Sequence, residues 1–158
     1  IDSLQAELDG HTHAIADVSG LQTALDGKAS SSHGTHVSYS TTAPVMDGTE
    51  HEVLSKAAGH FPNTGAVGSG NYCIAGHNST IYAEIFNEMK NIEIGMKMYL
   101  IDNDEKRTKY TYKVTDNFIV EPTETWILDD FKDNRITIVT CTDDGTQRQI
   151  VIGKLIEN

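Results

Sequence analysis

Short apolar runs separated by polar turns dominate the chain from Glu50 onward. Runs rich in β-branched and aromatic residues, bounded by Gly, Asn, Asp or Ser, are typical of strands. The sequence predicts strands at residues 71–75, 98–101, 109–114, 118–122, 136–141 and 149–156. The second and third of these flank the polar turn DNDEKRT, so we expect them to form a hairpin. Several strands at this spacing favour a barrel or a sandwich.

One segment within this part has a helical period instead. In STIYAEIFNEMKNI, residues 79–92, the apolar residues Ile81, Ile85 and Met89 recur every four positions, with polar residues between them. This spacing places them on one face of a helix, which would pack on the sheet. The predicted fold is therefore mainly β, a barrel with one short helix.

The first 43 residues follow another pattern. LQAELDGHTH, residues 4–13, returns as LQTALDGKASSSHGTH, residues 21–36. Each unit predicts a short helix that ends at an Asp-Gly pair, and in the second unit Ile15, Val18, Leu21 and Leu25 are spaced approximately as a heptad. A single helix of this kind cannot bury its apolar stripe, so it needs neighbouring chains or stays frayed.

The N-terminal stretch GHTHAIADVSGLQTALDGKA resembles the histidine-bearing repeats of phage tail-fibre proteins, over about residues 1–49. The resemblance implies trimerisation through an N-terminal extension, here residues 1–43. Some members of that family hold a metal ion on the fibre axis through histidines, and His11 and His13 are the candidates here. One chain supplies too few ligands for a closed site. We therefore expect a solvated loop, with no metal or other cofactor.

Length and charge narrow the function classes. A chain of 158 residues suffices for one compact domain, or for a smaller domain plus an extension. The formal net charge of −11 argues against nucleic acid or an anionic membrane surface as a partner. No apolar run approaches the roughly 18 residues that span a bilayer. The start lacks a signal-peptide pattern, so we expect no export signal or anchor in this chain.

The two cysteines, Cys73 and Cys141, have neither the number for a disulfide framework nor the spacing of a zinc site. Cys73 lies inside a predicted strand and is interpreted as a small buried apolar residue. Cys141 ends the strand ITIVTC, and the polar turn TDDGTQ separates it from Arg148. Closure of this turn as a hairpin would place Cys141 and Arg148 at the same end of adjacent antiparallel strands.

A thiol becomes a nucleophile when a nearby positive group stabilises its thiolate and the sulfur stays accessible. His77 is a second candidate partner for Cys141. It lies in IAGHNS, where a predicted strand gives way to a loop and Gly76 is expected to allow the turn. Alone, His77 is more readily interpreted as a structural histidine and Arg148 as a surface arginine; together with Cys141 they suggest an active site.

Three segments, IAGHN, ITIVTC and GTQRQIVIGKL, resemble in this order the three signatures of the sortases. The segment PVMDGTEHEVLSKAAGHFPNTGAVGSGNY resembles the part of that family that leads to the catalytic histidine. The resemblance covers about residues 44–158. It implies a sortase-like β-barrel, and a cysteine transpeptidase at the extracellular face of a Gram-positive membrane.

The resemblance also implies a role for each candidate. Cys141 would attack an LPxTG-like sorting signal and form a thioester. His77 would protonate the departing amine and then act as a base for the incoming amine. Arg148 would bind substrate and stabilise the oxyanion. The expected partners are surface proteins with this signal and an amine of a peptidoglycan precursor or a pilin lysine.

The sequence departs from the family pattern in several places. Asn78 stands where many members have Arg, and Ile138 replaces the usual Leu. The short connection between Val120 and Arg135 has no room for the helical insertion of class B enzymes, which favours a class A- or D-like member. THVSYSTTA, residues 35–43, occupies the place of the family's first strand.

These departures predict a join within residues 43–49. We expect residues 1–42 to make few contacts with the barrel, and an edge left open where the first strand is missing or replaced. Two alternatives to the transpeptidase follow. One is an inactive chimera, a structural fragment of a fibre or adhesin; the other is a hydrolytic cysteine peptidase that uses the same residues.

Overall fold

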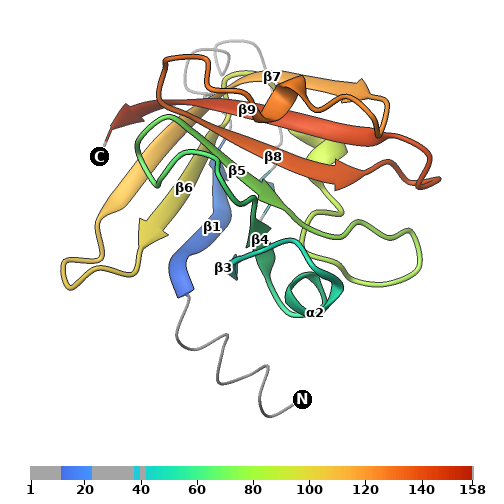
Figure 1. Cartoon of the computed structure of the whole chain (residues 1–158), viewed down its shortest axis with the longest axis horizontal. Coiled ribbons are helices and arrows are strands. Elements are labelled where there is room, and N and C mark those ends of the chain that lie inside the picture. Colours follow the sequence, from blue (N-terminus) through green and yellow to red (C-terminus); the bar gives the residue numbers. More distant parts are fainter. Residues whose placement is uncertain (1–11, 23–37, 40–41, 158) are drawn as a thin grey trace, which may run out of the picture.

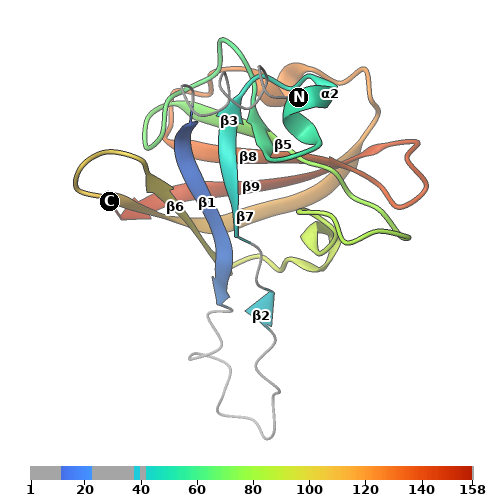
Figure 2. The same cartoon turned by 90° about the horizontal axis from the view of Figure 1, so that it is seen from below.

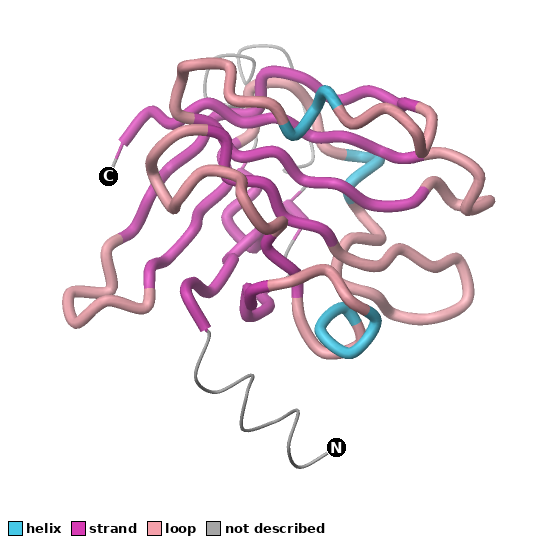
Figure 3. Tube along the Cα trace, viewed as in Figure 1, coloured by secondary structure: helices cyan, strands magenta, loops and turns pink. Residues whose placement is uncertain are grey.

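The computed structural model describes residues 12–22, 38–39 and 42–157, and most of its elements are strands (Figures 1 and 3). The strands are β1 (Thr12–Gln22), β2 (Ser38–Tyr39), β3 (Thr42–Asp47), β4 (Ala58–His60), β5 (Asn71–Ala75), β6 (Lys97–Asp102), β7 (Lys109–Val120), β8 (Arg135–Cys141) and β9 (Arg148–Glu157). The helical elements are α2 (His51–Leu54) and two 3₁₀ turns, η2 (Met89–Asn91) and η3 (Trp126–Leu128).

The strands form one curled sheet that closes on itself. Their order is β2-β1-β3-β4-β5-β8-β9-β7-β6, and a further pairing of β1 with β6 joins the two sides. Figure 2 shows β1 lying between β3 and β6. The pairs β3–β4 and β5–β8 are parallel, and the other pairs are antiparallel. The expected barrel is therefore confirmed, with β1 as part of its wall.

The main core fills the inside of this barrel. Strands β3 to β9 contribute buried side chains to it, among them Tyr72 and Ile74 from β5 and Ile136 and Ile138 from β8. Because successive residues of a strand point to opposite faces, these alternate positions define the inner face of the sheet.

A second apolar cluster covers the outer face of β7, β8 and β9. It contains Val120, Val139, Ile150, Ile152 and Ile127, the last of which comes from η3. The connection between β7 and β8, residues 121–134, crosses this face and has η3 as its only helical element among the described residues. The sheet is thus packed on both faces near the carboxyl end of β8.

Most strand predictions are confirmed. The strand at residues 71–75 has the predicted bounds, and the DNDEKRT turn joins β6 to β7 as a hairpin. The predicted strands 109–114 and 118–122 are one strand, β7, because Thr115-Asp116 is a register irregularity against β9 rather than a turn. A bulge of this kind bends a strand without ending it.

The helix predicted at residues 79–92 is wrong. Only η2 is helical there, and Ile81, expected on the packed face, is 81% exposed. Polar side chains form hydrogen bonds with backbone amides and carbonyls that would otherwise bond to each other in a helix. Ser79 Oγ accepts from the amides of residues 81 and 82, while the Asn87 side chain bonds the amide of Ser79 and the carbonyl of Tyr82. Such local bonds compete with helical ones.

The expectations for the N-terminal stretch also change. Residues 12–22, predicted as part of a helical repeat, form β1, and this strand pairs with both β3 and β6. The expectation that residues 1–42 make few contacts with the barrel is therefore wrong for this part, as is the open edge. Two unfilled strand edges offer a ladder of backbone hydrogen bonds, which outweighs a weak helical pattern. The rest of the fibre-like repeat, including His11, lies outside the described residues.

Candidate active site

Strands β8 and β9 form the hairpin that the sequence predicts, with Cys141 directly opposite Arg148. Directly opposed residues of an antiparallel pair place their side chains on the same face, with Cβ atoms about 5 Å apart. The turn is closed by backbone bonds from the Thr142 amide to the Gln147 carbonyl at 3.0 Å and from the Gly145 amide to the Thr142 carbonyl at 2.8 Å. The predicted pairing of Cys141 and Arg148 is confirmed.

The backbone of His77 lies beside the same strand end. The parallel β5–β8 ladder runs to the pair Ala75 and Val139. Beyond it, the Gly76 amide donates to the Val139 carbonyl at 3.1 Å, and Thr140 Oγ1 donates to the Gly76 carbonyl at 2.7 Å. The chain thus follows β8 for two residues past the end of β5 and carries His77 to the level of Cys141.

Gly76 has a packing role there rather than a turn role. A Cβ at this position would lie 2.4 Å from a ring carbon of Phe86, and the glycine does not have a positive φ. Phe86 is 1% exposed and belongs to the main core. The glycine therefore lets the loop after β5 fold back onto the barrel directly before His77.

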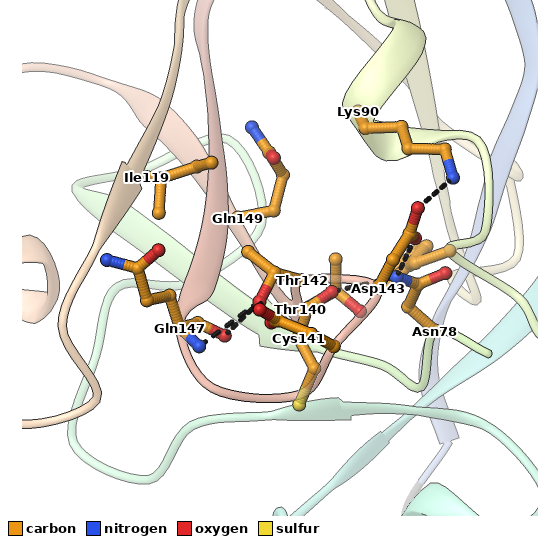
Figure 4. Close-up of a pocket in the computed structure, with 11 residues that line it drawn as sticks. Asn78, Lys90, Ile119, Thr140, Cys141, Thr142, Asp143, Gln147 and Gln149 are labelled. Carbon is orange, nitrogen blue, oxygen red and sulfur yellow. Dashed lines mark hydrogen bonds and ion pairs between the residues drawn. The ribbon is translucent and has the colours of Figure 1, made fainter. Parts of the chain in front are cut away.

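Strand alternation places Cys141 and Arg148 on the outer face. On β8, Val139 belongs to the outer cluster and lies two residues before Cys141; on β9, Ile150 belongs to that cluster and lies two residues after Arg148. Residues two apart share a face. In Figure 4 the Cys141 sulfur accordingly points away from Gln149, which lies two residues before Val151 of the inner core and so shares its face.

The three candidate side chains are half-buried, and none of them forms an ion pair with another described residue. The Arg148 guanidinium donates from Nη1 to the Gln147 carbonyl at 3.0 Å, and no carboxylate pairs with it among the described residues. In the same part of the chain, no hydrogen bond joins the side chains of His77, Cys141 and Arg148. The strand ends thus bring the backbones of the three residues to one end of the sheet.

Cys73 lies in a different environment. It is 0% exposed, and its thiol donates to the Asn71 carbonyl at 3.5 Å. Burial raises the pKa of this thiol to about 12, against smaller lowering effects from Thr64, Thr137 and Arg135. The prediction that Cys73 is buried is confirmed, and the raised pKa keeps its thiol protonated near neutral pH.

Sequence reasoning missed a polar group beside Cys141. Figure 4 shows Asn78, Asp143 and Lys90 linked in a row on one side of a pocket that Thr140 and Cys141 also line. Asn78 Nδ2 donates to the Cys141 carbonyl at 2.9 Å and to Asp143 Oδ1 at 3.0 Å, and Lys90 Nζ lies 2.5 Å from Asp143 Oδ2. The hydrogen bonds from Lys90 and then Asn78 lower the pKa of Asp143.

The sequence indicates this polar group only through the closeness of two of its members to the candidate site residues. Asn78 follows His77, and Asp143 lies two residues after Cys141. Their contact joins segments 65 residues apart, and a single sequence does not reveal such a distant pairing.

No group of metal-ligating side chains occurs in the described parts of the chain. The side chain of His13, like the whole of His11, falls outside what the structure describes. Within the same described residues, no helix has the length and apolarity to cross a bilayer.

The fold and this strand-end site are accompanied by a family match. Residues 37–156 match the model of the sortase domain, so the chain belongs to the sortase family. The match begins before residue 44, the first residue of the domain predicted from the sequence. That boundary and the fibre-like origin of residues 1–43 stay predictions.

Several relatives are similar along much of the chain. Sortase A of Bacillus anthracis is 34% identical over 122 residues, which are 75% of this chain and 56% of that protein. Sortase A of Listeria monocytogenes is 32% identical over 113 residues, 70% of this chain and 50% of that protein. The chain thus spans about half the length of these curated relatives.

Solved structures agree with the fold. A sortase D5 transpeptidase of Clostridium perfringens superposes with a TM-score of 0.72 at 26% identity, covering 99% of this chain and 88% of that one. A Listeria monocytogenes sortase A has a TM-score of 0.70 at 26% identity, covering 93% of this chain and 88% of that one.

Proposed function

We propose that this domain is a cysteine transpeptidase that cleaves an LPxTG-like sorting signal and transfers it to an amine. The observation that carries the proposal is the direct pairing of Cys141 with Arg148 at the end of β8 and β9, beside the backbone of His77, in a chain of the sortase family. The cysteine supplies a nucleophile, the histidine a proton donor and acceptor, and the arginine a fixed positive charge.

The first half-reaction uses all three groups. The Cys141 thiolate attacks the carbonyl carbon of the scissile peptide bond, and a C–S bond forms while the carbonyl oxygen becomes negative. Arg148 donates to this oxygen, and its planar fork suits an oxyanion. The C–N bond then breaks, and the imidazolium of His77 gives its proton to the departing amine. The product is a thioester on Cys141.

The second half-reaction reverses these roles. An incoming amine attacks the thioester carbon, and neutral His77 takes the proton that the amine loses. The C–S bond breaks, Cys141 leaves as the thiolate, and a new peptide bond remains. The acceptor is an amine of the cell wall or of a pilin, and the reaction takes place at the extracellular face of a Gram-positive membrane. Trimerisation through residues 1–43 is a separate proposal.

The connection between β7 and β8 supports a class A- or D-like enzyme. Residues 121–134 hold no helix besides η3, so this connection lacks a long helical insertion. The relatives and structures reported above include proteins called sortase A and sortase D5.

Incubation of the protein with an LPxTG peptide, with and without an added amine, tests the function. The transpeptidase predicts peptide cleavage and an amide product that requires the amine. Hydrolysis at an equal rate in both arms would favour the cysteine peptidase alternative. Absence of turnover in both arms, from folded protein, would favour the inactive chimera.

A further inference from the structure

We propose that Asn78 is a positioning residue, which holds His77 and Cys141 at a fixed separation through the row Asn78–Asp143–Lys90. This inference rests on the proposed function, because it assigns a task to residues around the proposed nucleophile. The main observation behind it is that the side-chain amide of Asn78 donates hydrogen bonds both to the carbonyl of Cys141 and to Asp143 in the loop that follows β8.

Asn78 acts where the β-ladder has ended. The last backbone pair between β5 and β8 is Ala75 with Val139, so the residue that carries the imidazole has no ladder bond of its own to β8. The Asn78 side chain supplies the missing link at 2.9 Å from the Cys141 carbonyl. Because Asn78 is bonded covalently to His77, this link fixes the spacing of the two backbones.

The orientation of this amide is determined by its partners. Both partners, a carbonyl and a carboxylate, are acceptors, so only the NH₂ group can face them. The Oδ1 atom is then left buried without a hydrogen-bond partner among the described residues. An unsatisfied buried acceptor costs free energy. The amide is therefore held by its two donor bonds, to the Cys141 carbonyl and to Asp143, which fix its orientation at the end of β8.

The other end of the row is anchored in the barrel. Lys90 lies in η2, where the preceding residue, Met89, is 2% exposed in the main core. The Lys90 and Asp143 side chains are 45% and 42% exposed, and ion pairs this exposed contribute little to stability. Their effect is on the direction of the Asp143 carboxylate, which in turn holds the Asn78 amide.

The test is a double-mutant cycle between Asn78 and His77. The readout is the rate at which iodoacetamide alkylates Cys141, measured against pH and assigned by peptide mass spectrometry. A nearby imidazolium changes the thiolate fraction, so His77→Ala should alter the pH profile. We expect Asn78→Ala to shift the profile in the same direction, and to have no further effect in the His77→Ala background. An equal effect of Asn78→Ala in both backgrounds, or none in either, would overturn the proposal.

Further variants should shift the alkylation profile of Cys141 by different amounts. Asn78→Asp keeps the shape but loses both donors, so it should act at least as strongly as Asn78→Ala. Lys90→Met should have a smaller effect in the same direction. Lys132→Met is the matched control, since it removes another exposed lysine–aspartate pair, with Asp130, and should leave the profile unchanged. Equal effects of Lys90→Met and Lys132→Met would contradict the role of the row.

A parallel transfer assay separates this inference from the proposed function. Asn78→Ala should lower kcat by on the order of 10-fold with KM nearly unchanged, because misplaced catalytic groups slow the chemical step. If wild-type protein transfers no peptide, the proposed function fails, while the alkylation cycle still decides whether Asn78 couples His77 to Cys141. A variant that melts far below the wild type is replaced in the cycle by Lys90→Met, whose exposed pair contributes little to folding.

Discussion

The two thiols of this chain lie on the neighbouring parallel strands β5 and β8 but in contrasting environments. Cys73 lies in the middle of β5, directly beside Thr137 of β8, and is 0% exposed. Cys141 lies at the carboxyl end of β8, opposite Arg148, and is half-buried. The residue type is the same, so the position along the strand makes the difference. A strand centre desolvates a thiol, whereas a strand end leaves it accessible and close to the residues of the adjoining loops.

The largest expected effect comes from removing the thiol at the strand end. Cys141→Ala should abolish both cleavage of an LPxTG peptide and transfer to an amine, because no other accessible thiol among the described residues can form the thioester. Peptide turnover measured by mass spectrometry, with folding checked by circular dichroism, provides the test. Turnover that survives in this variant would mean that the nucleophile lies elsewhere.

The next effect concerns His77, whose backbone lies beside the end of β8. His77→Ala should lower turnover by roughly 10²–10⁴-fold, since the departing amine would leave without a proton. The measurement is kcat/KM for transfer of an LPxTG peptide to an amine. A folded variant that keeps the wild-type kcat/KM would remove His77 from the mechanism.

A smaller loss is expected from the opposing strand. Arg148→Lys keeps the charge but replaces the two-donor fork by a single ammonium, so kcat should fall by on the order of 10- to 10³-fold. Comparison with Lys154→Arg, which changes an exposed cation further along β9, controls for general effects of the exchange. Equal activity of Arg148→Lys and wild type would show that the guanidinium is not needed.

The pH dependence of the free energy of unfolding tests the environment of the buried thiol, Cys73. Burial raises the pKa of Cys73 to about 12, above its value in the unfolded chain. The folded state therefore keeps this proton longer, and the resulting stability is complete below the unfolded pKa and is lost as pH rises toward 12. Tyr72 and Tyr112 have raised pKa values for the same main reason, so they add to this loss above pH 10.

Cys73→Ser isolates the contribution of the thiol. Between about pH 8.5 and 10, the free energy of unfolding should fall more steeply in wild type than in the variant, by at most about 1.4 kcal/mol per pH unit. Urea unfolding at several pH values measures this slope. Parallel slopes for the two proteins would mean that Cys73 is not desolvated as its burial indicates.

The sequence predicted the parts of this comparison that depend on local pattern. Apolar runs located β5, β6, β8 and β9, and the turn after Cys141 predicted its pairing with Arg148. The local pattern predicted the wrong secondary structure where hydrogen bonds to other parts of the chain determine it. Residues 12–22 have a weak helical period, yet they form strand β1 because they pair with β3 and β6. The segment after His77 has a helical period too, but Ser79 and Asn87 satisfy its backbone differently.

In the candidate site too, some residues could be predicted from local sequence and others could not. Cys141, Arg148 and His77 are marked by short motifs, so they could be named from the sequence. The contact of Asn78 with Asp143 depends on how the loops after β5 and β8 meet in space, and no local pattern encodes it. Gly76 is expected from the sequence to allow a turn, but the structure shows that the ring of Phe86 requires its small size.

The smallest expected effect is that of Cys73→Ser on transfer. The serine is buried in place of an unreactive thiol, so a folded variant should keep turnover within about 2-fold of wild type, consistent with the desolvation of this thiol. The same LPxTG transfer assay applies. Loss of transfer in a variant that melts like the wild type would make Cys73 part of the mechanism.

Mapping of the covalent intermediate tests the central claim most directly. Wild-type protein is incubated with an LPxTG peptide without an amine, quenched in acid, digested and analysed by mass spectrometry. The account predicts an acyl adduct on the peptide that contains Cys141, which hydroxylamine removes, and no adduct on the peptide that contains Cys73. An adduct on Cys73, or cleavage of the substrate by a Cys141→Ala variant with no adduct at all, would contradict it.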